Sequence, residues 1–199
     1  MKGFVFLLAF WAGAAQAQES FSGNGYLLSC GEEGCFINAA GFNLFAPEGQ
    51  APLDALRDLP MMSAVQVEGT LSDMGDSSAT ITLSSAAPIA DDLYEGNLQF
   101  MQGAWRPEGE ETPFHISIAG MDWIEVLGEG EETYFMMSVG EYCGDGTFPG
   151  NGMVISLYRY GDDPGDDACW RLEYVDETTL ELRDFKGEQG AVTFTRMTE

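Results

Sequence analysis

Short segments in which apolar and polar residues alternate run through most of the chain and predict β-strands. In Val65–Leu71 (VQVEGTL) the alternation places the apolar residues on one face of a strand. The first region has four such segments: Tyr26–Ser29, Phe36–Ala39, Val65–Leu71 and Ala79–Leu83. Between them, Pro52–Leu59 carries leucines at every third position before Pro60, which predicts a short helix. Residues 18–92 are therefore expected to form a small β-rich region with the order β-β-α-β-β.

The remainder of the chain, residues 93–199, has the same strand character without a convincing helix. It contains eight segments rich in β-branched and aromatic residues: Leu98–Arg106, Phe114–Ala119, Trp123–Leu127, Thr133–Val139, Gly152–Tyr160, Cys169–Val175, Thr179–Phe185 and Ala191–Met197. Short strands at such regular spacing are typical of a sandwich or a barrel. The fold class predicted for the whole chain is mostly β, with an antiparallel barrel in the second part.

The N-terminus has the pattern of a signal peptide, predicted over residues 1–17. Lys2 provides the positive charge, and Phe4–Ala12 is an apolar run too short to span a bilayer, which takes about 20 residues. Ala15-Gln16-Ala17 fits the small-x-small cleavage rule. We therefore expect a bacterial protein that is exported to the periplasm or secreted, with no membrane insertion after cleavage.

Export makes the four cysteines candidates for disulfide bonds. Three connectivities exist, and Cys30–Cys35 with Cys143–Cys169 is favoured because each pair stays within one half of the chain. Cys30 and Cys35 also flank a short turn between two predicted strands of a hairpin. Zinc or thioredoxin-like chemistry is disfavoured, because the chain has no C-x-x-C motif and one histidine only.

The stretch Leu98–Trp105 ends in Gly103-Ala104-Trp105 and resembles the G-x-W opening strand of lipocalins and other calycins. This resemblance implies an up-and-down barrel with Trp105 closing one end. It also implies that Arg196, near the last strand, packs over the tryptophan in a structural cation–π contact. Residues 20–88 resemble small exported OB-type barrels through the segment Val65–Leu71.

The net charge of the chain narrows the range of partners. The sequence has 33 acidic residues against 8 basic ones, for a formal charge of −25. A nucleic-acid-binding protein needs a basic stripe to neutralise phosphates, and an anionic membrane surface also requires cations. Both partners are therefore excluded. The acids are spread over both halves of the chain, which favours a role in solubility over a single docking patch.

Candidate catalytic and metal-binding residues are few. His115 is the sole histidine, and the alternation in Phe114–Ile118 puts it with Ser117 on the polar face of a strand. No nucleophile elbow, nucleotide-binding loop or metalloprotease motif accompanies it. Four aspartates, Asp162, Asp163, Asp166 and Asp167, raise the question of a weak Ca²⁺ site but lack the EF-hand pattern. We expect no enzyme, no cofactor and no dedicated metal site.

Aromatic residues on the predicted strands are the remaining candidates for a binding site. Trp123 and Trp170 are the two expected to contact a ligand, although aromatic residues also fill barrel cores. The leading hypothesis is an exported, non-catalytic binding protein for a small apolar ligand or a protein partner. The alternatives are a periplasmic inhibitor of a cationic hydrolase such as lysozyme, and an accessory subunit of an envelope assembly.

Overall fold

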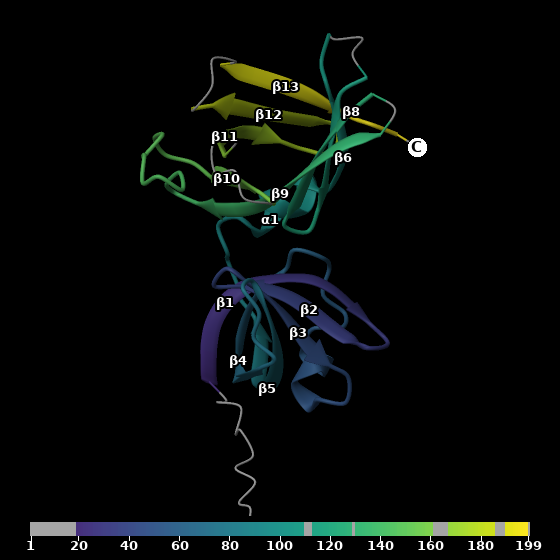
Figure 1. Ribbon diagram of the computed structural model, residues 1–199, viewed down its shortest axis with the longest axis vertical. Helices are drawn as coiled ribbons and strands as arrows, with labels where there is room; N and C mark the ends of the chain where they lie inside the picture. The colour runs from purple at the N-terminus through teal and green to yellow at the C-terminus, as the bar shows by residue number, and fades with distance from the viewer. Residues whose placement is uncertain (1–18, 110–112, 129, 161–166, 186–189, 199) are drawn as a thin grey trace, which may run out of the picture.

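The computed structural model describes residues 19–109, 113–128, 130–160, 167–185 and 190–198. They form two closed β-barrels that follow one another along the chain and lie end to end (Figure 1). The predicted mostly-β class is confirmed. The predicted signal peptide, residues 1–17, lies outside the described residues. No helix among the residues described is both long and apolar enough to span a membrane.

The N-terminal barrel consists of five strands in the order β1-β2-β3-β5-β4, closed by pairing between β1 and β4. The strands are β1 (Glu19–Gly31), β2 (Gly34–Ala39), β3 (Phe42–Pro47), β4 (Ala64–Ser72) and β5 (Ser78–Pro88). All pairs are antiparallel except β3 with β5. As the alternation predicts, the apolar residues of β4, Val65, Val67 and Leu71, point into the barrel core.

Two features of this region differ from the prediction. The predicted helix over Pro52–Leu59 is only a short 3₁₀ helix, Ala51–Ala55, because the leucines serve as core anchors: Leu53 and Leu56 are buried in the barrel. The sequence pattern also missed β3. It is six residues long and includes Asn43 and Pro47, which are both unfavourable in strands.

The C-terminal barrel is closed, antiparallel and eight-stranded, as predicted. Its strands are β6 (Gly103–Pro107), β7 (His115–Ala119), β8 (Asp122–Leu127), β9 (Glu131–Gly140), β10 (Val154–Arg159), β11 (Ala168–Val175), β12 (Thr179–Asp184) and β13 (Ala191–Arg196). They pair in chain order, and β13 returns to pair with β6. Such up-and-down closure leaves no free sheet edge.

The first predicted strand of this barrel, Leu98–Arg106, is wrong in its first half. Residues Glu95–Met101 form helix α1, which precedes β6. Leu98 and Met101 are three positions apart and both fully buried, so this apolar pair fits one face of a helix as well as a strand. The Asp92 carboxylate accepts the backbone N–H groups of Tyr94 and Glu95 at the helix start.

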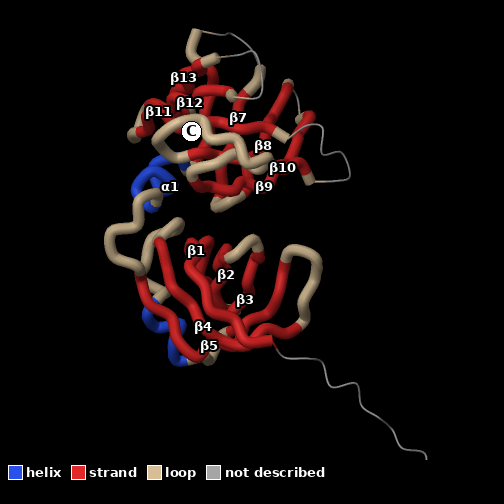
Figure 2. The backbone as a smooth tube through the Cα atoms, turned by 90° about the vertical axis from the view of Figure 1, so that its left-hand side faces the viewer, coloured by secondary structure: helices blue, strands red, loops and turns tan. Residues whose placement is uncertain are grey.

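Helix α1 lies at the end of the C-terminal barrel that faces the N-terminal barrel (Figures 1 and 2). Met62, from the loop before β4, is buried in the same apolar cluster as Leu98 and Met101, and Leu28 packs against this cluster. The Tyr26 hydroxyl donates to Asp92 at 3.2 Å. Burial and the neighbouring carboxylate raise the pKa of Tyr26. The barrels therefore share apolar and polar contacts at this junction.

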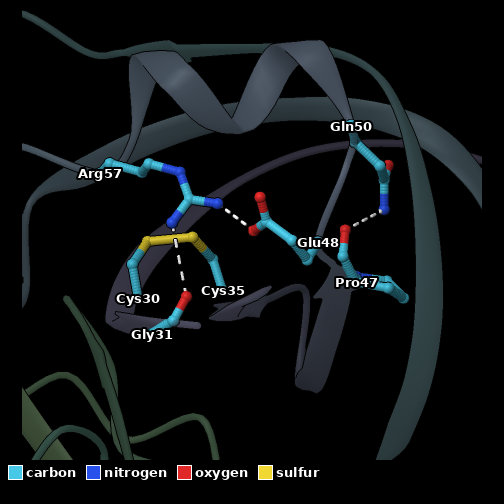
Figure 3. Close-up of a disulfide and its surroundings, with 7 residues drawn as sticks. All are labelled: Cys30, Gly31, Cys35, Pro47, Glu48, Gln50 and Arg57. Carbon is cyan, nitrogen blue, oxygen red and sulfur yellow. Dashed lines mark hydrogen bonds and ion pairs between the residues drawn. A yellow bond between two sulfur atoms is a disulfide. The ribbon is translucent and has the colours of Figure 1, made fainter. Parts of the chain in front are cut away.

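Both disulfides have the predicted pairing, Cys30–Cys35 and Cys143–Cys169. Figure 3 shows the first, at the end of the β1–β2 hairpin, beside Arg57. The Arg57 guanidinium forms an ion pair with Glu48 and donates to the carbonyl oxygen of Gly31, which ties the 3₁₀-helix segment to the hairpin. Two disulfides suggest an oxidising, exported environment.

Candidate ligand-binding cavity

Trp105 on β6 is fully buried in the core of the C-terminal barrel, next to the end of helix α1. Its indole Nε1–H donates to the backbone oxygen of Met101 at 2.7 Å. The Arg196 guanidinium carbon lies 4.1 Å from the centre of the Trp105 ring, and the guanidinium donates to the backbone oxygens of Phe100, Gln102 and Glu177. The Arg196 contacts connect the last strand to helix α1. The single donor of the Trp105 side chain, its indole N–H, has a partner.

The opposite half of the barrel contains a cavity of about 1100 Å³. It is formed by β6, β7, β8, β11, β13 and the segments next to them. Its walls are mostly apolar, and the lining residues are Pro107, Glu108, Gly109, Pro113, Phe114, Ile116, Trp123, Glu125, Leu127, Trp170, Ala191, Val192, Thr193 and Phe194. Ligand pockets in proteins typically measure about 300–1,000 Å³, so this volume is sufficient for a small molecule.

Trp123 and Trp170, the two residues singled out from the sequence, both line this cavity. They are 1% and 8% exposed, and the indole Nε1–H of each is buried without a hydrogen-bond partner. A buried donor left unpaired costs about 1–3 kcal/mol, so nearly all such groups in proteins have an acceptor. Trp105, in the same barrel, follows that rule. For Trp123 the chain itself supplies a neighbouring acceptor, the Glu125 carboxyl.

A carboxyl group, Glu125, lies beside Trp123 on the same wall. Both side chains point inward from β8, because residues two apart on a strand share a face. Burial raises the pKa of Glu125, while the nearby Trp123 indole and the Arg159 guanidinium oppose the rise. The Trp123 indole N–H is therefore close enough to the Glu125 carboxyl to stabilise its charged form.

The charge of the cavity is negative. Glu108 and Glu125 are the two ionisable residues among the described lining residues, and neither Lys, Arg nor His is among them. Arg159 lies near Glu125 but does not line the cavity. The side chains that make part of the wall polar are Glu108, Glu125 and Thr193, and most of the other lining side chains are apolar.

The other candidate residues from the sequence lie elsewhere. His115 and Ser117 are half-buried on β7 and alternate with Ile116 and Ile118, which point into the core. Of the four aspartates considered for Ca²⁺, Asp162, Asp163 and Asp166 lie outside the described residues. Asp167 accepts a hydrogen bond from the Arg159 backbone N–H at 3.4 Å. Within the described part of the chain, no group of three or more His, Cys, Asp and Glu side chains is placed to hold a metal ion.

Glu125 is the candidate residue that sequence reasoning missed. One of 33 acidic residues attracts no notice by itself. The available signal was its position in Trp123-Ile124-Glu125-Val126-Leu127, where alternation puts the acid on the same face as the tryptophan. An acid on the inward face of a barrel strand is unusual enough to mark a polar group of a binding site.

No known protein family matches the chain, and neither does any curated protein or solved structure.

Proposed function

We propose that this chain is an exported, non-catalytic binding protein of the lipocalin-like kind, whose C-terminal barrel holds a small apolar ligand. The observation that carries the proposal is the cavity of about 1100 Å³, which Trp123 and Trp170 both line.

The resemblance to lipocalins supports this assignment. The eight strands pair in chain order, and Arg196 covers the ring of the buried Trp105. The N-terminal barrel has the strand number and closed form of OB-type barrels. Its acidic composition does not suit the oligonucleotides that many OB folds bind. We propose that the N-terminal barrel stabilises the C-terminal barrel, because Met62 from the loop before β4 is buried in the apolar cluster of the C-terminal barrel, with Leu98 and Met101 of helix α1.

A protein partner is a second candidate, favoured by an exposed apolar patch near the barrel junction. Leu93, Tyr142 and Phe148 are 81%, 57% and 51% exposed and line a hollow of about 500 Å³. Exposed apolar clusters often mark protein contacts. This version predicts that a Leu93→Ser, Phe148→Ser variant loses a protein that co-purifies with the wild type from the periplasm. Recovery of the wild type as a free monomer contradicts it.

The ligand version is tested by titrating the protein with a neutral naphthalene dye that fluoresces in apolar surroundings. We expect saturable binding to the wild type. Val192→Trp puts a large ring on a lining position and is expected to weaken dye binding at least tenfold. Thr195→Trp, on the same strand but exposed and outside the lining, is the matched control and should bind as the wild type does. Equal affinity for all three proteins overturns the proposal.

A further inference from the structure

The hollow of about 500 Å³ beside helix α1 shares no lining residue with the barrel cavity. One side of it is formed by the residues at the start of α1, and the other by the loop between β9 and β10. We infer that this hollow binds an organic cation whose charge is surrounded by methyl groups, such as a quaternary ammonium. The inference does not rest on the ligand proposed for the barrel cavity, so either can fail without the other.

Three aromatic side chains line the hollow: Tyr94 next to α1, and Tyr142 and Phe148 on the loop after β9. The ring centroids of Tyr142 and Phe148 are 5.3 Å apart and the ring planes are tilted by 44°, so the two rings form adjacent walls. Both side chains are about half exposed, which leaves ring surface accessible to a ligand. The face of an aromatic ring attracts a cation within about 6 Å of the ring centre, and methyl groups bury apolar surface against it. A methylated cation therefore makes both kinds of contact with these walls.

Glu141 brings a negative charge to the same hollow. It is the acidic residue among the described lining residues, and no Lys, Arg or His is among them. Burial, and then the charges of Glu141 and Asp92, raise the pKa of the Tyr94 phenol, so both carboxylates lie near that ring. Asp92 already accepts hydrogen bonds from the backbone N–H groups of Tyr94 and Glu95. Glu141 is therefore the carboxylate placed to compensate the charge of a bound cation.

The same features disfavour other classes of ligand. An anion meets the charge of Glu141 and the formal charge of −25 of the whole chain. A neutral molecule of the same shape contacts the rings but gains nothing from the carboxylate or from the ring electrostatics. A primary ammonium is strongly hydrated and has to exchange its water for the aromatic walls. A quaternary ammonium has no N–H group to leave unpaired.

Arg171 is a cation that contacts the loop on one side of the hollow. Its Nη1 donates to the backbone oxygen of Pro149 at 2.9 Å. Its Nε and Nη2 donate to one carboxylate oxygen of Glu173 at 3.1 and 2.6 Å, and Arg183 shares that oxygen. Arg171 does not line the hollow, because its guanidinium is directed to the backbone and to Glu173. A ligand in the hollow therefore contacts Glu141 and the aromatic rings, and not this guanidinium.

The inference is tested by titrating the protein with choline, with its neutral isostere 3,3-dimethylbutanol, and with butylammonium. About 0.15 M salt screens the general attraction of any cation to the acidic surface. The backbone ¹H–¹⁵N resonances of Asn97, Asn151 and Gly152 report on binding, because all three residues line the hollow. We expect saturable shifts of these resonances with choline. Choline should bind about tenfold more tightly than the alcohol and at least about threefold more tightly than butylammonium.

Two variants separate the contribution of the ring from that of the charge. Tyr142→Leu keeps apolar volume but removes the ring, so it should weaken choline about fivefold and the alcohol less than twofold. Tyr174→Leu is its matched control, because Tyr174 is also about half exposed but lies on β11, outside the hollow. Glu141→Gln keeps the size and removes the charge, and it should weaken choline about threefold. Glu68→Gln, at an exposed position of β4, is the control for the charge. Neither control should change the affinity for choline.

Several results overturn the inference. Choline that leaves the three resonances unmoved, or that moves resonances over the whole acidic surface without saturation, shows no site in the hollow. Equal affinities for choline and the alcohol, or tighter binding of butylammonium, contradict the ligand class. A Tyr142→Leu variant that binds choline as Tyr174→Leu does contradicts the role of the ring. Dye binding to the barrel cavity is a separate measurement, so the proposed function stands or fails independently of these results.

Discussion

Replacing Arg196 tests how the C-terminal barrel is closed. The guanidinium covers the Trp105 ring and donates to three backbone oxygens, two of which belong to helix α1 and the residue that ends it. Lysine keeps the charge but has no planar fork, so Arg196→Lys retains at most one of these bonds. Arg196→Met keeps an apolar stem over the ring and loses all of them.

The size of the effect follows from those contacts. A net contribution of about 1 kcal/mol for each of three backbone hydrogen bonds, with about 0.5–1 kcal/mol for a partly exposed cation–π contact, gives about 3–4 kcal/mol for Arg196→Met. Arg196→Lys should cost about 2–3 kcal/mol by the same reasoning. With a urea m-value of about 1.5 kcal/mol per molar, the midpoint of unfolding falls by about 2 M in the methionine variant.

Tryptophan fluorescence during urea unfolding measures the shift of the unfolding midpoint in the C-terminal barrel. Residues 19–88 contain no tryptophan, whereas Trp105, Trp123 and Trp170 all belong to the C-terminal barrel. Thr195→Ala, at the neighbouring exposed position, is the control and should shift the midpoint only slightly. A midpoint for Arg196→Lys equal to that of the wild type refutes the assignment of stability to the guanidinium fork.

Three further changes have expected outcomes that follow from the same structure. Replacing Cys143 and Cys169 together with alanine should lower the free energy of unfolding by about 3.5 kcal/mol on the chain-entropy model, and a loss below about 1 kcal/mol in urea contradicts this. Asp176 accepts hydrogen bonds from the backbone N–H groups of Thr178 and Thr179, which lowers its pKa to about 2. The charged carboxylate therefore stabilises the fold above the ordinary pKa of aspartate, and this contribution is lost as the pH falls towards about 2. Asp176→Ala should therefore unfold at lower urea than the wild type at pH about 6 but not at pH about 2, and a constant difference is evidence against this role. Burial raises the pKa of Glu125, so ionisation of this carboxyl destabilises the fold. Glu125→Gln should therefore be more stable than the wild type above that raised pKa, and the difference should disappear on acidification. Urea titrations from pH about 4 to about 8 measure the difference in stability, and a difference that does not change with pH contradicts the prediction.

The strands of the C-terminal barrel could be predicted because each buries one face. In β7, for instance, Ile116 and Ile118 point inward and alternate with polar neighbours. The prediction was wrong where the spacing of apolar residues fits both a helix and a strand: Leu98 and Met101 were assigned to a strand but lie in helix α1. It also failed at β3, which contains Asn43 and Pro47 and forms a hairpin with β2; its second pairing, with β5, is parallel and joins segments separated by the whole of β4. Such non-local pairing has no signal in a local window.

The candidate site was only partly accessible from the sequence. Trp123 and Trp170 were identifiable as aromatic residues on strands, but their placement in a cavity depends on which strands meet after closure. Glu125 gains its raised pKa from burial by its neighbours on adjoining strands, including Ile116 on β7. The burial of both indole nitrogens is a property of the assembled barrel and has no counterpart in the sequence pattern.

The most direct test of a ligand in the barrel observes the three barrel indoles in one experiment. In ¹H–¹⁵N spectra of the protein labelled on tryptophan, titration with the naphthalene dye should shift the indole N–H resonances of Trp123 and Trp170, because both residues line the cavity. The Trp105 resonance should stay in place, because its N–H already donates to Met101 at 2.7 Å. If the dye leaves the Trp123 and Trp170 resonances unmoved, or moves all three alike, the account of the barrel as a ligand-binding cavity is contradicted.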